Sequence, residues 1–297
     1  MLGLSEGGLG GQDATDEFPA SGRNAYPSGA NTFFADATTC TLEDTESLES
    51  IFEQIDVGEK GFYITLDGNY GQIFVMFGAG LKLVYGEQIG NYVEKAMCWN
   101  IEEYPLINPP EMPKYSRHKE YEEWVFSNPH LCWPPWARAG VYHWGIWMER
   151  GHVDFGSVAT RDTMVKMQME IVIWPLFKSM GVLTRAQRIL LAALDMEWMP
   201  EYEEILKKYP DATRRLFTTE ERECFTLRAC LVNVFTECHV DGGDVKNGWA
   251  SMCPLGEFEN EDFCITELKR RFVYKVGAIS FLKSEQFEHF TLRWSGH

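Results

Sequence analysis

The most constraining feature of the sequence is a series of short β-like runs that fills the chain from Phe225 to Trp294. Turn residues separate the runs, which read FTLRACLVNVFTECHVD, DFCIT, RFVYKV, GAISFLKS and HFTLRW. Runs of this length and composition predict short strands that pair antiparallel. Because helical patterns precede them, the sequence predicts an α+β protein in which helices brace a β-barrel or sandwich.

Two further elements are predicted near the start of the patterned sequence. The segment LESIFEQI predicts a short helix over residues 48–55, because its apolar residues recur on one helical face. The following segment, GFYITLDGNYGQIFVMFG, predicts two strands joined by a turn at Asp67-Gly68-Asn69.

The middle of the chain, about 158–210, is predicted to form helices that support the strands. After a predicted strand in VYHWGIWME, apolar residues recur at helical spacing up to Pro175 and predict a core-facing stripe. Thr184 is predicted to cap the N-terminus of a helix in RAQRILLAALDMEW, and Pro200 to open another in EYEEILKKY. The stripe consists of Met164, Met167, Ile171 and Trp174.

Length and composition indicate one catalytic domain. At 297 residues and 45% hydrophobic, the chain can bury a large core, which we place at 46–297 with a metal-binding β core over about 217–297. Residues 1–45 are rich in Gly, Ser, Ala, Asp and Thr, which predicts a flexible acidic tail. Eight scattered cysteines without a CxxC pair, and no signal peptide or apolar run of about 20 residues, predict an intracellular protein without a membrane span.

The charge is strongly acidic but unevenly distributed. The net charge of −17 argues against a nucleic-acid partner. Residues 1–60 alone carry −10, however, and from Cys264 to His297 six basic residues face three acidic ones. The sequence therefore leaves open either a locally basic face or ordinary solvated charges around an enzyme.

The segment ECHVDGGD carries the clearest chemical signal. In an extended backbone, residues two apart point to the same face, so His239 and Asp241 can converge on one point. Two imidazoles and one carboxylate on one face of an octahedral ion are typical of non-haem Fe(II) oxygenases, which keep the opposite face open. The apolar run CLVNVF before the motif predicts a buried strand that presents these ligands at its end.

His289 is the predicted third ligand. It follows His239 by fifty residues, which allows three or four short strands to cross a small barrel and return, with Gly277 at the turn before the return strand. The alternative for His289 is a histidine at the barrel mouth that only forms hydrogen bonds. A second HxD pattern begins at His152, but a helical pattern follows it and no third ligand lies at suitable spacing.

From about Phe217 to His297 the chain resembles the TET/JBP-like 2-oxoglutarate, Fe(II)-dependent dioxygenases, in the branch expanded in fungi. The resemblance covers about eighty residues, and the family pattern is specific as a set rather than motif by motif. Its elements here are Asn233, His239-Val240-Asp241, Asp244, Gly248, Pro254-Leu255-Gly256-Glu257-Phe258, Glu267-Leu268, Gly277, His289-Phe290 and Gly296.

The resemblance implies a double-stranded β-helix fold and an enzyme that oxidises a C–H bond with Fe(II), O₂ and 2-oxoglutarate. Family members act on 5-methylcytosine or thymine in nucleic acid, so a methylated base in DNA is the expected substrate, with nuclear localisation. We expect Asn233 to hydrogen-bond in the cosubstrate pocket, or else to the backbone at a strand edge. Asp244 is expected to orient a metal ligand, or else to be a turn residue.

The chain departs from the family pattern at two places. Asn260-Glu261 stands where the family often has Gly-Gly, which affects the substrate loop. The family arginine that binds the distal carboxylate of 2-oxoglutarate would fall at position 298, so Arg293 or Lys283 would have to replace it. We expect a C-terminally truncated family member whose last strands are missing. The alternatives are an inactive metal-binding module, or a hydroxylase of a protein or small molecule; no obligate protein partner is expected.

Overall fold

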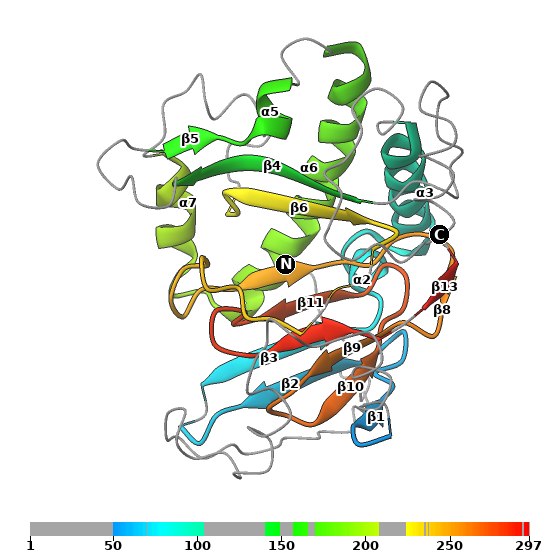
Figure 1. Cartoon of the computed structure of the whole chain (residues 1–297), viewed down its shortest axis with the longest axis vertical. Coiled ribbons are helices and arrows are strands. Elements are labelled where there is room, and N and C mark those ends of the chain that lie inside the picture. Colours follow the sequence, from blue (N-terminus) through cyan, green and yellow to red (C-terminus); the bar gives the residue numbers. More distant parts are fainter. Residues whose placement is uncertain are drawn as a thin grey trace, which may run out of the picture.

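The computed structural model describes residues 50–69, 71–103, 140–148, 157–165, 170–207, 224–234, 236, 238–292 and 294–296. Two four-stranded sheets form its centre (Figure 1). The first sheet has the order β2 (Phe62–Leu66), β3 (Gln72–Phe77), β11 (Ile279–Leu282), β7 (Ala250–Met252). The second has the order β1 (Glu53–Ile55), β10 (Arg270–Val273), β9 (Asp262–Ile265), β12 (His289–Thr291).

Alternating residues of β3 build the two sides of the first sheet. Phe74 and Met76 belong to the apolar cluster shared with the second sheet, whereas Val75 belongs to the cluster beneath the helices. The Phe74 ring lies 4.6 Å from the ring of Phe272 in β10 and 6.0 Å from that of Phe263 in β9, measured between centroids. The two sheets therefore pack face to face through aromatic side chains, as period-two alternation requires.

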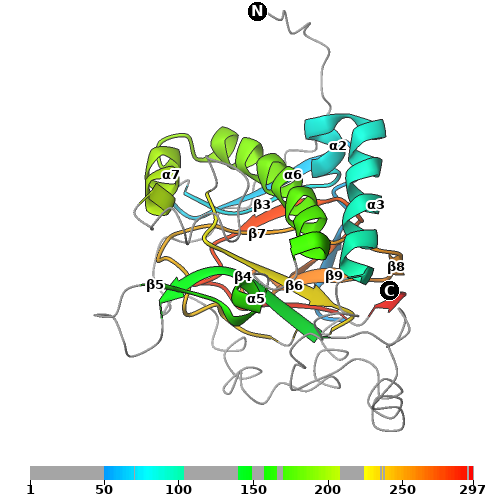
Figure 2. The same cartoon turned by 90° about the horizontal axis from the view of Figure 1, so that it is seen from above.

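Helices and a third sheet cover the other side of the first sheet. The third sheet has the order β5 (Ser157–Ala159), β4 (Gly140–Met148), β6 (Leu227–Val232), and β8 (Phe258–Glu259) pairs with β13 (Ser295–Gly296). The helices are α2 (Gly80–Tyr85), α3 (Glu87–Glu103), α5 (Arg161–Val165), α6 (Glu170–Leu194) and α7 (Met199–Lys207). Helices α2, α3 and α6 contact one another, as the view from above shows (Figure 2).

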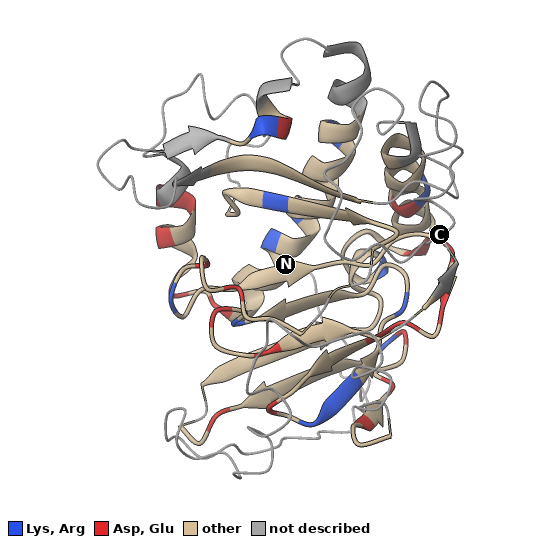
Figure 3. Ribbon diagram, in the orientation of Figure 1, with Lys and Arg blue, Asp and Glu red and all other residues tan. Residues whose placement is uncertain are grey.

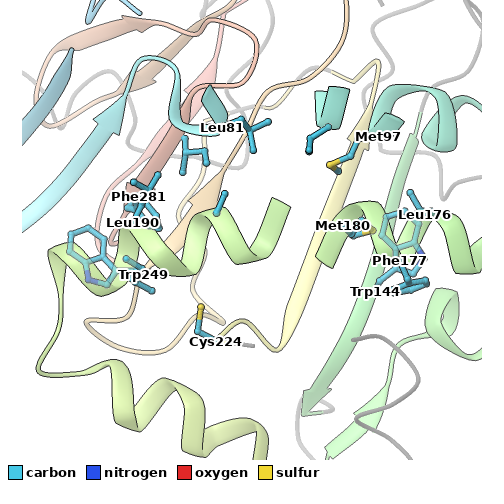
Figure 4. Packing of buried hydrophobic residues seen from close by; sticks show 14 of the residues in the cluster. Leu81, Met97, Trp144, Leu176, Phe177, Met180, Leu190, Cys224, Trp249 and Phe281 are labelled. Atoms are coloured by element: carbon cyan, nitrogen blue, oxygen red, sulfur yellow. The ribbon is translucent and has the colours of Figure 1, made fainter. Parts of the chain in front are cut away.

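The helical layer and the first sheet share one large core. Leu81 from α2, Met97 from α3 and Leu190 from α6 pack in the cluster that includes Phe281 of β11 and Trp144 of β4 (Figure 4). Phe281 and Trp144 are fully buried. This core fixes one face of β11, so the strand is rigid where its end approaches the site described below. In the described part of the chain, no helix combines the length and apolar character needed to cross a membrane.

The observed architecture agrees with an α+β protein that contains several antiparallel sheets braced by helices. The hairpin around Asp67 is confirmed, because β2 and β3 pair antiparallel and Asp67 accepts the amides of Asn69 and Gly71. The predicted strands at DFCIT, RFVYKV, GAISFLKS and HFTLRW correspond to β9, β10, β11 and β12. The double-stranded β-helix and the missing last strands stay predictions, and the predicted 1–45 tail lies outside the described residues.

Two helix predictions were wrong. Residues 53–55 of the predicted 48–55 helix form β1, which pairs parallel with β10, more than two hundred residues away in sequence. Thr184 does not cap a helix: it lies inside α6, which runs through Pro175, and its hydroxyl donates to the Gly181 carbonyl at 3.2 Å. Pairing with β10 outweighs the helical pattern at residues 53–55, and burial of Thr184 within α6 outweighs its tendency to cap a helix. The side chains of the predicted Met stripe lie outside the described residues.

Gly277 occupies the turn before β11, as predicted, and its backbone requires a glycine. Its φ is +75°, and a Cβ built there would lie 2.1 Å from Oε1 of Glu94 in α3. We predict that Gly277→Ala lowers the free energy of unfolding by about 1–2 kcal/mol from the backbone alone, with a further loss from displacing Glu94. Urea unfolding of Gly277→Ala, Glu94→Ala and the double variant separates the two losses, and a Gly277→Ala protein as stable as the original contradicts the prediction.

Candidate metal centre

Backbone pairing places the two histidines side by side. His239 and His289 form an isolated antiparallel bridge, in which each amide donates to the other residue's carbonyl, at 3.1 and 2.9 Å. Residues directly opposite in an antiparallel pair project their side chains from the same face. The two rings accordingly lie with their centroids 4.3 Å apart. Because His289 begins β12, both imidazoles are fixed to the second sheet.

Asp241 is held by the other sheet. Its amide donates to the carbonyl of Ser284, just past the end of β11, at 3.0 Å. The chain turns at this point, because the Gly242 amide donates to the Val240 carbonyl at 2.9 Å. The sequence predicted an extended strand at His239–Asp241, but this segment is not a regular strand. The predicted buried strand before it is also wrong: β6 is only half-buried, ends at Val232 and belongs to the third sheet.

The three side chains converge on one point. Each offers one ligand atom, and these atoms all lie within 4.8 Å of one another. Asp241 presents one oxygen to each imidazole, with Oδ1 3.4 Å from Nε2 of His239 and Oδ2 3.5 Å from Nε2 of His289. The His289 side chain is 6% exposed, whereas those of His239 and Asp241 are 38% and 39% exposed. The triad is thus closed on the His289 side and open to solvent on the other.

The hydrogen bond of His289 leaves its Nε2 atom without a proton in the site. Nδ1 lies 3.0 Å from the carbonyl oxygen of Phe287, which can only accept, so Nδ1 carries the proton. Burial and, to a lesser extent, the neighbouring His239 lower the pKa of His289 to about 4, against the opposing effects of Phe287 and Asp241. At neutral pH the ring is therefore neutral, and the Nε2 lone pair points into the triad.

The arrangement suits a cation. Without one, the Nε2 lone pair of His289 faces an anionic oxygen of Asp241 across 3.5 Å with no proton between them. Partial burial raises the pKa of Asp241, but hydrogen bonds from His239 and Ser284 and electrostatic interactions with both imidazoles outweigh it, so the pKa lies below its usual value. A positive ion between these acceptors would remove the repulsion, and two nitrogens with one carboxylate are a donor set for Fe(II).

We predict a pH dependence of stability for the metal-free protein that arises from His289. Its folded pKa of about 4 lies below the usual 6.5, so only the unfolded chain takes up a proton between these values. The contribution of His289 to the free energy of unfolding should therefore fall as the pH drops from 6.5 to 4, by roughly 3 kcal/mol at about 1.4 kcal/mol per pKa unit. Asp241, with its lowered pKa, does not titrate in this window.

Urea unfolding with a chelator present, at several pH values between 7 and 4.5, measures this dependence. His289→Gln should flatten it, because the neutral amide takes up no proton in either state. Equal slopes for the original chain and His289→Gln would contradict the prediction.

The other residues singled out from the sequence have mixed placements. Asn233 follows β6, is 9% exposed and has a φ of +49°. Lys283 places Nζ over the ring of Trp249, 5.2 Å from its centroid, in the core beneath the helices. Arg293 lies outside the described residues, as does the second HxD pattern at His152. Asn233 and Arg293 as cosubstrate residues therefore stay predictions.

Two residues next to the triad carry contacts that sequence reasoning did not assign. Both carboxylate oxygens of Glu267 accept the amide of Glu288, at 3.1 Å, which fixes the backbone just before His289. The Ser284 hydroxyl donates to Oδ2 of Asp244 at 2.5 Å. The sequence pointed to Glu267, because this residue belongs to the Glu-Leu pair of the family pattern. Ser284 gave no signal, because a serine after a strand is common in any β protein.

Three of the six basic residues in the C-terminal segment form ion pairs with acidic residues of the described chain. Arg271 contacts Asp262 at 2.7 Å, and Lys275 contacts Asp56 at 2.8 Å. Arg270 contacts Glu53 of β1 at 3.3 Å. Arg270 and Arg271 belong to β10, and Figure 3 shows positive charge on this strand, away from the helices. Ion pairs with β9 and with residues 53–56 therefore neutralise three of the six basic residues of this segment.

Comparisons with known proteins gave one kind of match. No protein-family model matches the chain, and no curated protein matches it. Among the solved structures that match is NgTET1 in complex with 5mC DNA, with a TM-score of 0.44 and 12% sequence identity. The match covers 89% of this chain and 87% of that one.

Proposed function

We propose that the chain is an Fe(II)- and 2-oxoglutarate-dependent dioxygenase that oxidises a C–H bond, with a methylated base in DNA as its substrate. The observation that carries the proposal is the convergence of His239, Asp241 and His289, with ligand atoms within 4.8 Å of one another. The substrate follows from the resemblance of the last eighty residues to the TET/JBP-like enzymes. We further propose that the two packed sheets are a double-stranded β-helix, and that the protein acts in the nucleus.

The donor set and its exposure support this chemistry. His239, Asp241 and His289 would hold the ion through Nε2, a carboxylate oxygen and Nε2. An Fe(II) ion bound there together with a 2-oxo acid supplies the activation of O₂ that oxidation of a C–H bond requires. The buried His289 closes one side, while the half-exposed His239 and Asp241 leave the other side accessible to cosubstrate and substrate.

The hydrogen bonds around the triad define what each residue contributes. The Phe287 carbonyl holds the proton on Nδ1 of His289 and so keeps Nε2 free as a donor atom. The backbone bridge between His239 and His289 keeps the two rings side by side. Asp241, whose lowered pKa keeps it ionised, supplies the negative charge that balances a divalent cation.

The proposal is tested by turnover and by a spectrum. Incubation with Fe(II), 2-oxoglutarate and O₂ should yield succinate, and the yield should rise with an oligonucleotide that contains 5-methylcytosine but not with the unmethylated sequence. Under anaerobic conditions, 2-oxoglutarate added to the Fe(II)-loaded protein should produce a metal-to-ligand charge-transfer band. His239→Ala should lose both signals, whereas His143→Ala, a matched change in β4, should keep them.

Other outcomes identify the alternatives. Metal binding without a charge-transfer band or succinate would indicate a metal-binding module that does not use 2-oxoglutarate. If succinate forms but its yield does not rise with methylated DNA, the protein is still an oxygenase. Methylated DNA would then be rejected as its substrate, in favour of a protein or small molecule. Metal binding that is unchanged in His239→Ala would reject the whole proposal.

A further inference from the structure

Ser284 occupies a fixed position between the first sheet and the metal-binding loop. It lies two residues beyond β11, and its side chain is 1% exposed. The neighbouring Lys283 amide donates to the carbonyl of Ile73 in β3 at 3.2 Å, so this segment stays paired with the sheet past the end of β11. Ser284 therefore has little freedom to move relative to the first sheet.

A ring of three hydrogen bonds connects Ser284 to the loop. The Asp241 amide donates to the Ser284 carbonyl at 3.0 Å, and the Asp244 amide donates to the Asp241 carbonyl at 2.9 Å. The ring closes where the Ser284 hydroxyl donates to Oδ2 of Asp244 at 2.5 Å. The last bond is the shortest of the three.

This ring determines where Asp241 stands relative to the imidazoles. His239 and His289 are fixed to the second sheet by their bridge, whereas Asp241 is joined to the first sheet through Ser284. Because the ligands come from two sheets, the geometry of the triad depends on how the loop is attached to β11. The side-chain bond to Asp244 attaches the loop to Ser284 at a second point, beside the backbone bond of Asp241.

We infer that Ser284 is a positioning residue that sets the Asp241 carboxylate at its distance from the two imidazoles, both by its own contacts with Asp241 and through Asp244. The inference rests on the proposed function, because it concerns the residues that hold the metal. Partners that orient metal ligands typically contribute about 10- to 100-fold to metal affinity. Loss of the Ser284 hydroxyl should therefore weaken metal binding without removing any ligand.

The test is Co(II) titration of the full chain, followed by visible d–d absorption and by calorimetry. Ser284→Ala should bind Co(II) about 10-fold more weakly than the original chain and give an altered d–d spectrum. Ser280→Ala is the matched control: Ser280 lies in β11, is also fully buried, and its hydroxyl contacts the Tyr274 hydroxyl at 3.2 Å instead of the loop. Its Co(II) affinity and spectrum should not change.

A double-variant cycle tests the route through Asp244. Asp244→Ala, at an exposed turn, should also weaken Co(II) binding, and the double variant should lose no more than Ser284→Ala alone. Losses that add in the double variant overturn the role of Asp244. If Ser284→Ala does not fold, the affinity and spectrum of Asp244→Ala decide alone.

The two possible failures are distinguishable. If the original chain binds no Co(II), both the proposed metal centre and this inference are rejected. If the original chain binds Co(II) and both Ser284→Ala and Asp244→Ala bind it equally well or more tightly, only the positioning role is overturned.

Discussion

Asp241→Ala should abolish stoichiometric metal binding and, with it, succinate formation above background. Asp241 is the only anionic ligand of the triad, and each of its oxygens faces one imidazole nitrogen. Its removal leaves two neutral nitrogens for a divalent cation. The loss in affinity should therefore exceed the roughly 100-fold upper range seen when only an orienting partner is removed.

Calorimetry with Fe(II) or Co(II) under anaerobic conditions measures this effect. Asp56→Ala is a suitable control, because it removes an exposed carboxylate that pairs with Lys275 outside the triad. It should leave metal affinity unchanged. A dissociation constant for Asp241→Ala within about threefold of the original value would show that the carboxylate is not a ligand.

Phe74→Ala should produce the largest loss of stability. The Phe74 side chain is fully buried between the two sheets and packs against Phe272, Phe263 and Tyr63. Truncation of a buried phenylalanine removes its transfer free energy and leaves a cavity, which together cost about 3–5 kcal/mol. Because Phe263 also contacts the ring of His289, with 5.7 Å between centroids, the same change should weaken metal binding.

Urea unfolding provides the measurement, with Phe62→Ala as the matched control. Phe62 lies on the neighbouring strand β2 and is 52% exposed, so its truncation should cost less than about 1 kcal/mol. If the two variants lose similar amounts, the face-to-face packing of the sheets is not what stabilises the protein.

The elements that the sequence predicted correctly are those with strong local signals. The Asp67-Gly68-Asn69 turn between two β-rich runs defined the β2–β3 hairpin without knowledge of any other part of the chain. Gly277 marked the turn before β11 for the same reason, because its positive φ is a local requirement. The predicted helix at 48–55 was wrong because β1 is created by its partner β10, and no local pattern contains that partner.

The candidate site shows the same division. Residue type and spacing singled out His239, Asp241 and His289, and the bridge between the two histidines brings them together. The sequence could not show that the imidazoles belong to one sheet and the carboxylate to the other, because that depends on register. The role of Ser284 depends on the same tertiary arrangement, so it became visible only through its contacts with Asp241 and Asp244.

A crystal structure of the full chain grown anaerobically with Fe(II), with data collected at the iron absorption edge, is the most direct measurement. We predict a single strong anomalous peak at bonding distance from Nε2 of His239, Nε2 of His289 and a carboxylate oxygen of Asp241, with the remaining positions open toward solvent. An ion bound elsewhere, or no ion within reach of all three side chains, would contradict the metal centre on which the proposed function depends.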